Sequence, residues 1–239
     1  MMTFLNLTPP LIPGEVGILK AINGWHSPIA DAFMYMISNT GAWIPVVAVL
    51  LYYLFSRKPW QEAVLFILSV GLCILICDRL SAGFAKPFFA RPRPTHLEGL
   101  GEYLHIVFGY KGAAYGFFSG HASNFIAVAM LMSRTIRDRL TSFLIFGIVL
   151  LVAYSRMYLG VHFLSDILMG FVVGLSAGYF VSLLHQVLRR RFSPSGYRPS
   201  KEVFAAQLGV WRLALMLFLP VLLAYSWQVA RILKMVGAY

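Results

Sequence analysis

The chain has 239 residues, of which 59% are hydrophobic and only 12% charged, and its mean hydropathy is +0.73. A soluble domain carries about a quarter charged residues, so this composition excludes an ordinary soluble enzyme and predicts one integral membrane domain over residues 1–239. The net charge of +11 does not indicate nucleic-acid binding, because the basic residues gather in short spacers between apolar runs. The opening residues lack a basic segment and a small-residue cleavage site, so we expect no cleaved signal peptide.

Residues 14–38 mix apolar and polar positions, which predicts N-terminal helices lying in the membrane interface. The polar positions there are Glu15, Lys20, Asn23, His26 and Asp31. Six apolar runs follow, each about long enough to cross a bilayer once boundary error is allowed: 41–55, which borrows residues upstream, 60–80, 121–136, 140–159, 162–188 and 209–236. We therefore expect an all-α, polytopic membrane helix bundle with about six transmembrane helices, the last of them an extra C-terminal span.

Basic residues mark one side of the predicted bundle. They follow the first, third and fifth runs or begin the sixth, and they are Arg57, Lys58, Arg134, Arg137, Arg139, Arg189, Arg190, Arg191, Arg198, Lys201 and Arg212. The positive-inside rule makes these connections cytoplasmic. The loop near residues 84–120, the joint near residue 160 and both termini are then expected outside. We predict a multi-pass membrane protein of a bacterial inner membrane whose site faces the periplasm.

Three polar clusters fall on that outer side. They are "KPFFARPRP" with Lys86 and Arg93, "FSGH" with Ser119, Gly120 and His121, and "YSRMYLGVHFLSD" with Arg156, His162 and Asp166. Ionisable residues are costly in a membrane and usually functional there. Three cations suit a phosphoryl dianion, since Arg forks match its oxygens and Lys supplies a point charge. A serine and a glycine before a helix add a hydroxyl and backbone N–H groups at the helix's positive end.

The two histidines suggest nucleophilic catalysis. His162 and Asp166 are four residues apart, so a helix stacks them on one face. A carboxylate bonded to one imidazole nitrogen fixes the tautomer and leaves the other nitrogen free to attack. His121 can give a proton to the departing oxygen. Each residue alone could be an interfacial anchor, a helix histidine or part of a proton relay, but the clusters together favour a catalytic site.

The three clusters resemble the signature motifs K-x6-RP, PSGH and SR-x5-H-x3-D of the type 2 phosphatidic acid phosphatase superfamily, over residues 86–166. Phe118 stands where the family usually has proline and removes no catalytic group. The resemblance implies that His162 attacks phosphorus and becomes a phosphohistidine, that Asp166 holds its ring, and that His121 protonates the leaving group and later activates water. It also implies phosphate binding by Lys86, Arg93, Ser119, Gly120 and Arg156, with no metal and no cofactor.

The predicted position of the site favours a lipid phosphate, whose head reaches water while its tail stays in the bilayer. Membrane members of the family that this chain resembles hydrolyse undecaprenyl diphosphate, phosphatidylglycerophosphate, phosphatidic acid or lipid A phosphates. Arg91 and Lys111 are further cations near the motifs. Either they favour a head group with more than one phosphate or they anchor the interface. Undecaprenyl diphosphate is our first expectation, and the other lipids are alternatives.

Other functions remain open at this stage. A lipid phosphotransferase would use the same phosphohistidine but pass it to an alcohol. An anionic-lipid transporter could use the cations for binding and would not need the pair His162 and Asp166. A vanadium haloperoxidase shares the oxyanion pocket, but the predicted spans disfavour a member of that soluble group.

Overall fold

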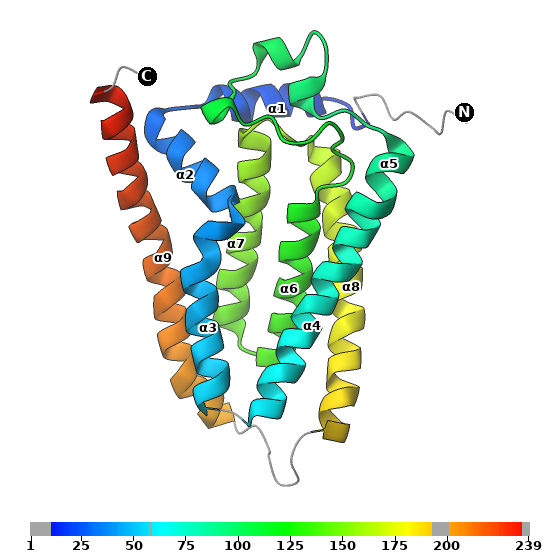
Figure 1. The fold of residues 1–239 in the computed structure, drawn as a ribbon, viewed down its shortest axis with the longest axis vertical. Coiled ribbons are helices and arrows are strands. Elements are labelled where there is room, and N and C mark those ends of the chain that lie inside the picture. Colours follow the sequence, from blue (N-terminus) through cyan, green and yellow to red (C-terminus); the bar gives the residue numbers. More distant parts are fainter. Residues whose placement is uncertain (1–10, 58, 193–200, 236–239) are drawn as a thin grey trace.

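The computed structural model describes residues 11–57, 59–192 and 201–235, so Lys58 and Arg198 of the predicted cytoplasmic clusters lie outside the described residues. The expected all-α membrane bundle is confirmed (Figure 1). Its α-helices are α1 (Glu15–Gly24), α2 (Pro28–Ser38), α3 (Ile44–Arg57), α4 (Trp60–Asp78), α5 (Lys86–Phe89), α6 (Gly120–Ile136), α7 (Arg139–Tyr158), α8 (Leu164–Phe192) and α9 (Lys201–Met235). A π-helical segment, η2 (Arg79–Ala85), joins α4 to α5, and short 3-10 helices occur at η1 (Thr40–Trp43), η3 (Pro94–His96), η4 (Gly101–Tyr103) and η5 (Val107–Gly109).

Four described helices are long and apolar enough to cross a membrane: Trp60–Phe89, Arg139–Tyr158, Leu164–Phe192 and Trp211–Met235. Pro28–Ser38 and Thr40–Tyr52 form a fifth candidate if this pair, bent by 75°, counts as one span. Counted that way, the short run 41–55 borrows residues upstream, as the sequence predicts. The remaining predicted run is α6, whose 17 residues pack against α4, α7 and α8.

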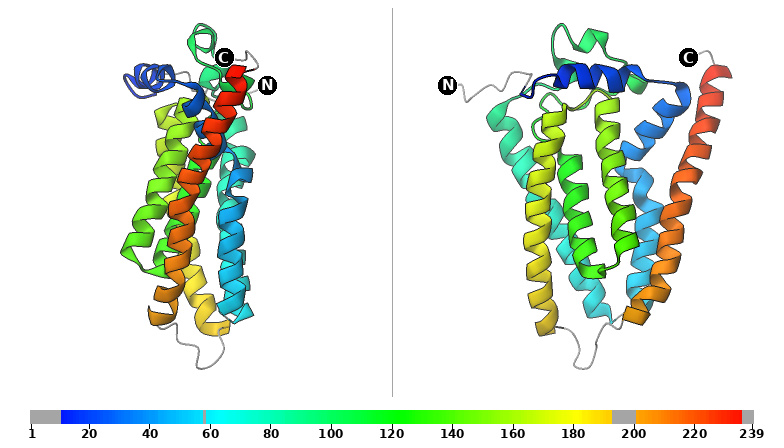
Figure 2. Two further views of the ribbon diagram at one scale, coloured as in Figure 1. Left: turned by 90° about the vertical axis from the view of Figure 1, so that its left-hand side faces the viewer. Right: turned by 180° about the vertical axis from the view of Figure 1, so that it is seen from behind.

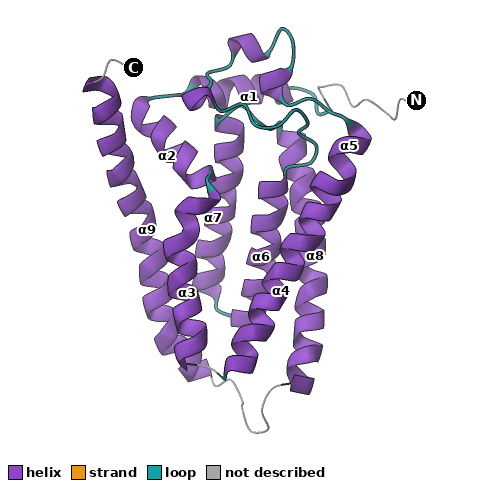
Figure 3. Cartoon of the chain, viewed as in Figure 1, coloured by secondary structure: helices purple, strands orange, loops and turns teal. Residues whose placement is uncertain are grey.

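The irregular chain gathers at one end of the bundle, hereafter the loop end, which carries α1 and residues 90–119 (Figures 1 and 3). The C-terminal end of α9 reaches the same end, and the α3–α4 and α6–α7 connections lie at the other (Figure 1). The expected interfacial position suits α1, which lies across the loop end. Helix α2 instead slants into the bundle to meet α3, as the views in Figure 2 also show.

Close packing of α8 on α6 fixes the frame of the loop end. Three glycines of α8, spaced four residues apart, face the α6 backbone. A Cβ added at Gly174 would lie 2.3 Å from the carbonyl oxygen of Ser123, and one at Gly170 would lie 2.8 Å from that of Ser119. At Gly178 the nearest atom would be the Ala127 carbonyl oxygen, 2.4 Å away. Small residues at this spacing let membrane helices approach closely.

Ion pairs hold the opposite end together. Glu62 of α4 pairs with Arg189 of α8 at 2.7 Å, and Asp138 pairs with Arg212 of α9 at 2.5 Å. Asp138 also caps α7, because its carboxylate accepts the backbone N–H of Thr141 at 2.7 Å. These contacts lie at the end of the bundle opposite the loop end. They connect the helices there without involving any motif residue.

Candidate active site

The motif segments meet at the loop end although each comes from a different helix terminus. Lys86 begins α5, and Arg93 follows α5 in the loop. Ser119 caps α6, whose first residues are Gly120 and His121. Arg156 lies near the end of α7, His162 precedes α8, and Asp166 lies in the first turn of α8. Direct contacts join the segments. Arg93 Nη1 lies 3.0 Å from His162 Nε2, and the Ser119 N–H donates to the Asp166 carbonyl at 3.0 Å.

The contacts of His162 determine its tautomer. A guanidinium has only donors, so Nε2 accepts from Arg93 at 3.0 Å and the ring proton lies on Nδ1. Nδ1 faces the Asp166 Oδ2 atom at 3.3 Å. His162 precedes α8 and is 1% exposed. Burial, followed by the charges of Arg93 and Arg156, holds the pKa of His162 well below its usual value. The ring is therefore neutral, and the lone pair on Nε2 faces the cations.

Asp166 is the anchor of this turn. It is 1% exposed, and its Oδ2 atom also accepts the Phe163 N–H at 2.9 Å. Its Oδ1 atom accepts from Arg91 Nη1 at 2.5 Å. With these donors in place, the carboxylate cannot rotate freely, so it orients the ring of His162.

Arg93 and Arg156 are buried cations whose hydrogen-bond acceptors in the described chain are all neutral. Arg93 donates to the Val161 carbonyl at 3.1 Å besides the imidazole, and Arg156 donates to the Ser38 hydroxyl and, at 3.1 Å, to the Tyr110 hydroxyl. Each has a buried Nε–H without an acceptor among the described residues. Burial, and then the charge of Arg156, lowers the pKa of Arg93 to about 10. Such unbalanced charge with spare donors suits a bound dianion.

The start of α6 adds a third positive feature. The Ser119 hydroxyl accepts the N–H of Ala122 at 3.4 Å, as an N-cap does. A Cβ added at Gly120 would lie 4.0 Å from Lys86 Nζ, so the ammonium group lies close to the helix N-terminus. Lys86 is also close enough to Arg93 and Arg156 for the three positive charges to repel one another. Backbone N–H groups and this ammonium together favour an anion here.

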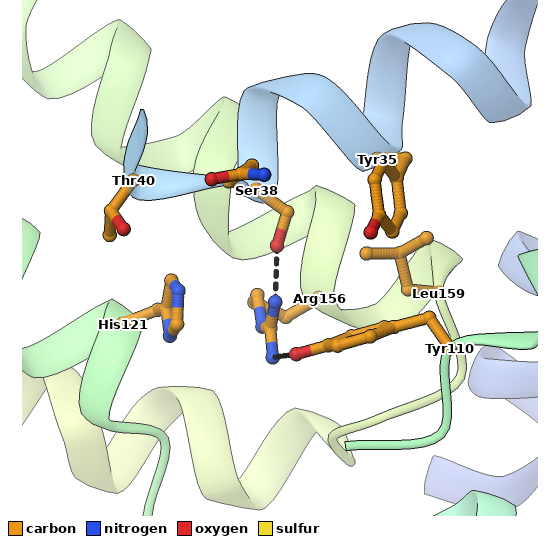
Figure 4. Close-up of a pocket in the computed structure, with 8 residues that line it drawn as sticks. Tyr35, Ser38, Thr40, Tyr110, His121, Arg156 and Leu159 are labelled. Atoms are coloured by element: carbon orange, nitrogen blue, oxygen red, sulfur yellow. Dashed lines mark hydrogen bonds between the residues drawn. The ribbon is translucent and has the colours of Figure 1, made fainter. Parts of the chain in front are cut away.

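A cavity of about 250 Å³ opens beside these groups and is lined by Tyr35, Ser38, Asn39, Thr40, Tyr110, His121, Arg156 and Leu159. Figure 4 shows His121 and Arg156 next to one another in its lining, with Ser38 and Tyr110 on the guanidinium. His121 is partly exposed, so an acid–base group is accessible from the cavity. Ser38 and Tyr110 were not expected from the sequence, since a serine at a helix end and one tyrosine among many carry no distinguishing pattern.

Arg91 has neither of the roles expected from the sequence. It is 1% exposed and donates to Glu15 Oε1 at 2.7 Å, to Asp166 and, at 2.7 Å, to the Ser165 hydroxyl. Glu15 Oε2 accepts the same Ser165 hydroxyl at 2.6 Å. Burial alone would raise the pKa of Glu15, but hydrogen bonds from Ser165 and Leu11 and the charge of Arg91 outweigh it and lower the pKa. Arg91 is therefore an internal ion-pair partner, whereas Lys111, the other extra cation, is exposed.

Comparison with known proteins shows the family. The sequence model of the PAP2 superfamily matches residues 62–190, more than half of the chain. The chain belongs to the PAP2 superfamily. It is 39% identical to a lipid A 4'-phosphatase of Porphyromonas gingivalis over 92% of this chain and 94% of the relative. A lipid A 4'-phosphatase of Bacteroides thetaiotaomicron is 29% identical, with 89% and 95% covered.

The fold is also found among solved structures. A transmembrane PAP2-type phosphatidylglycerolphosphate phosphatase from Bacillus subtilis superimposes with a TM-score of 0.54 and 25% identity, covering 74% of this chain and 87% of that one. The phosphatase family predicted from the three motifs is thereby confirmed.

Proposed function

We propose that this PAP2 phosphatase removes a phosphate from lipid A through a phosphohistidine at His162. The observation that carries the proposal is the setting of that ring: Nε2 faces Arg93 at 3.0 Å while Nδ1 faces Asp166 at 3.3 Å. A neutral imidazole held in this tautomer is a nucleophile directed at a cation-lined site. Arg93, Arg156, Lys86 and the start of α6 bind the phosphoryl oxygens.

In the first step, Arg93 exchanges its hydrogen bond with Nε2 for one with a phosphate oxygen, which frees the lone pair. His162 Nε2 attacks phosphorus, a P–N bond forms, and the ester P–O bond breaks with its electron pair passing to the leaving oxygen. His121, in the cavity lining, takes up a proton when the phosphoryl dianion binds beside it and gives that proton to the leaving oxygen. The Nδ1 proton stays on the ring, and Asp166 stabilises the positive charge that develops there.

In the second step, water attacks phosphorus and gives its proton to His121, while the P–N electron pair returns to Nε2. Inorganic phosphate leaves, and both histidines regain their starting states. The fixed cations supply the charge neutralisation that a metal ion provides in other phosphatases. We therefore propose that the chemical steps need no metal.

Lipid A replaces undecaprenyl diphosphate as the proposed substrate. The two lipid A 4'-phosphatases match about nine-tenths of this chain at 39% and 29% identity, which supports the 4'-phosphate. Arg91 does not favour a head group with a second phosphate, because it is bound to two carboxylates inside the protein. Undecaprenyl diphosphate remains the alternative to be tested.

We further propose that the loop end faces the periplasm of an inner membrane. Arg137 and Arg139 flank the α6–α7 connection at the opposite end, and Arg189, Arg190 and Arg191 end α8 there. The positive-inside rule supports a cytoplasmic location for that end.

The test is phosphate release by the detergent-purified protein, with mass spectrometry to identify which phosphate lipid A has lost. We expect loss of the 4'-phosphate, faster than release from undecaprenyl diphosphate or phosphatidylglycerophosphate. His162→Ala should abolish release, and the exposed His96→Ala should not. Substantial turnover by His162→Ala would reject the nucleophile. Transfer of the phosphate to added alcohol, without release in water, would identify a phosphotransferase.

A further inference from the structure

A second cluster of ionisable side chains lies at the loop end and contains none of the motif residues. It consists of His26 in the α1–α2 turn, Asp31 in α2 and His105 in the loop between η4 and η5. One ligand atom of each residue lies within 4.8 Å of the other two. His105 Nε2 is already 2.7 Å from Asp31 Oδ2, and the two imidazole rings stack with their centroids 3.8 Å apart. Two segments that are distant in sequence, residues 26–31 and the loop at His105, thus bring two imidazoles and a carboxylate together.

The surroundings hold two of these groups in place independently of each other. Asp31 is fully buried, and its Oδ1 atom accepts the Tyr158 hydroxyl at 2.5 Å. The backbone of His105 is fixed by Asn23, which accepts its N–H at 2.8 Å and donates to its carbonyl at 3.0 Å. A carboxylate that keeps one oxygen for a hydrogen-bond donor and offers the other is typical of metal ligands. Asp31 and His105 are therefore preorganised rather than brought together by chance contact.

His26 distinguishes this cluster from a simple ion pair. Asp31 and His105 already satisfy one another, and His26 is exposed, so burial does not force its ring against theirs. One nitrogen of His26 lies within 4.8 Å of the ligand atoms of both Asp31 and His105. Zn²⁺ bound at about 2.0–2.2 Å from nitrogen and oxygen needs donors roughly 3.4 Å apart. Binding would therefore require the exposed His26 ring to turn out of the stack and the 2.7 Å contact between His105 Nε2 and Asp31 Oδ2 to open as the ion enters.

We propose that His26, Asp31 and His105 bind a divalent transition metal, with Zn²⁺ the best match, and that water completes the coordination. Two imidazoles and one carboxylate are ligands that Zn²⁺ accepts and that Mg²⁺, which prefers oxygen, does not. The metal would join the α1–α2 turn to the loop that continues to Tyr110, a residue of the cavity lining. Its role is structural and separate from phosphate transfer.

The test uses the full chain, purified without a histidine tag and stripped with a chelator. Zn²⁺ titration by calorimetry should show one ion bound per chain and a rise in melting temperature. Co²⁺ should give the visible absorption of a tetrahedral site. Mg²⁺ should produce neither effect.

Three variants decide the assignment. His26→Gln changes an exposed side chain and should leave the fold intact, yet weaken Zn²⁺ binding at least tenfold, as should His105→Gln. The matched control His96→Gln changes another exposed histidine of the same loop and should bind Zn²⁺ like the original chain. No Zn²⁺ binding by the folded protein, or equal binding by His26→Gln, would overturn the proposal. These measurements do not use phosphatase activity, so they are independent of the function proposed above.

Discussion

Glu15→Gln tests whether the buried acid on α1 supports catalysis from a distance. Glu15 contacts Arg91 at 2.7 Å, and Arg91 contacts Asp166 at 2.5 Å. Because its pKa is lowered, Glu15 is charged at neutral pH, and the three groups carry a summed charge of −1 beside His162. The amide keeps the shape and changes that sum to zero. The positive charge that develops on the ring of His162 is then less stabilised.

The size of the effect follows from the contact that changes. A hydrogen bond to a charged group is worth about 1.5–3 kcal/mol, and Glu15→Gln turns the ion pair with Arg91 into a bond that is charged on the arginine side only. The substitution therefore weakens the hold on Arg91 by about 1–2 kcal/mol. If this loss appears fully in the transition state, kcat falls about 5- to 30-fold. KM should not change, since Glu15 touches Arg91, Ser165 and Leu11 and none of the phosphate-binding groups.

Steady-state phosphate release and thermal unfolding should be measured together. The control is Glu62→Gln, the same substitution in a buried carboxylate that pairs with Arg189 at the opposite end, also at 2.7 Å. Both variants should unfold at lower temperature, but only Glu15→Gln should lose kcat. An unchanged kcat in Glu15→Gln, or an equal loss in both variants, would refute the link through Arg91.

Three further predictions follow from packing, charge and topology. Gly174→Ala should lower the free energy of unfolding by about 1–3 kcal/mol, because its Cβ would be 2.3 Å from an α6 carbonyl, whereas Gly147→Ala has open space and should be neutral or stabilising by up to about 1 kcal/mol; thermal unfolding of both distinguishes packing from helix propensity. The stability advantage of the original chain over Glu15→Gln should be complete above about pH 4.5 and disappear as the pH falls through the lowered folded-state pKa; unfolding at several pH values checks this, and a constant difference would contradict it. Both native cysteines are fully buried, so a membrane-impermeant thiol reagent added to intact spheroplasts should label Lys111→Cys but not Arg137→Cys, and the reverse pattern would invert the proposed orientation.

The sequence predicts the bundle because each span has its own signal in consecutive residues. Apolar runs of sufficient length fix the positions of α4, α7 and α8, and the motif spacing predicts which residues gather at one end. The sequence does not place α2 inside the bundle, since Asp31 gives this helix an interfacial character. Asp31 is instead buried against Tyr158 and His105, and these partners are too distant in sequence for a local pattern to reveal.

The same limit applies to the two neighbouring arginines in "ARPRP". Arg91 and Arg93 are chemically identical and two residues apart; the K-x6-RP spacing assigns Arg93 to phosphate but does not reveal what Arg91 binds. The partners of the two arginines distinguish them. Arg91 lies between the carboxylates of Glu15 and Asp166, whereas Arg93 lies between a carbonyl and a neutral imidazole.

A cation already neutralised by two buried acids has little charge to offer a phosphate, and moving it would leave both acids unpaired. A cation with neutral partners can give up weaker hydrogen bonds for charge-assisted ones when a dianion arrives. Arg156, held by the hydroxyls of Ser38 and Tyr110, belongs with Arg93 in this respect. The division between supporting and phosphate-binding arginines in this site therefore follows from the charge of the acceptor that each one faces.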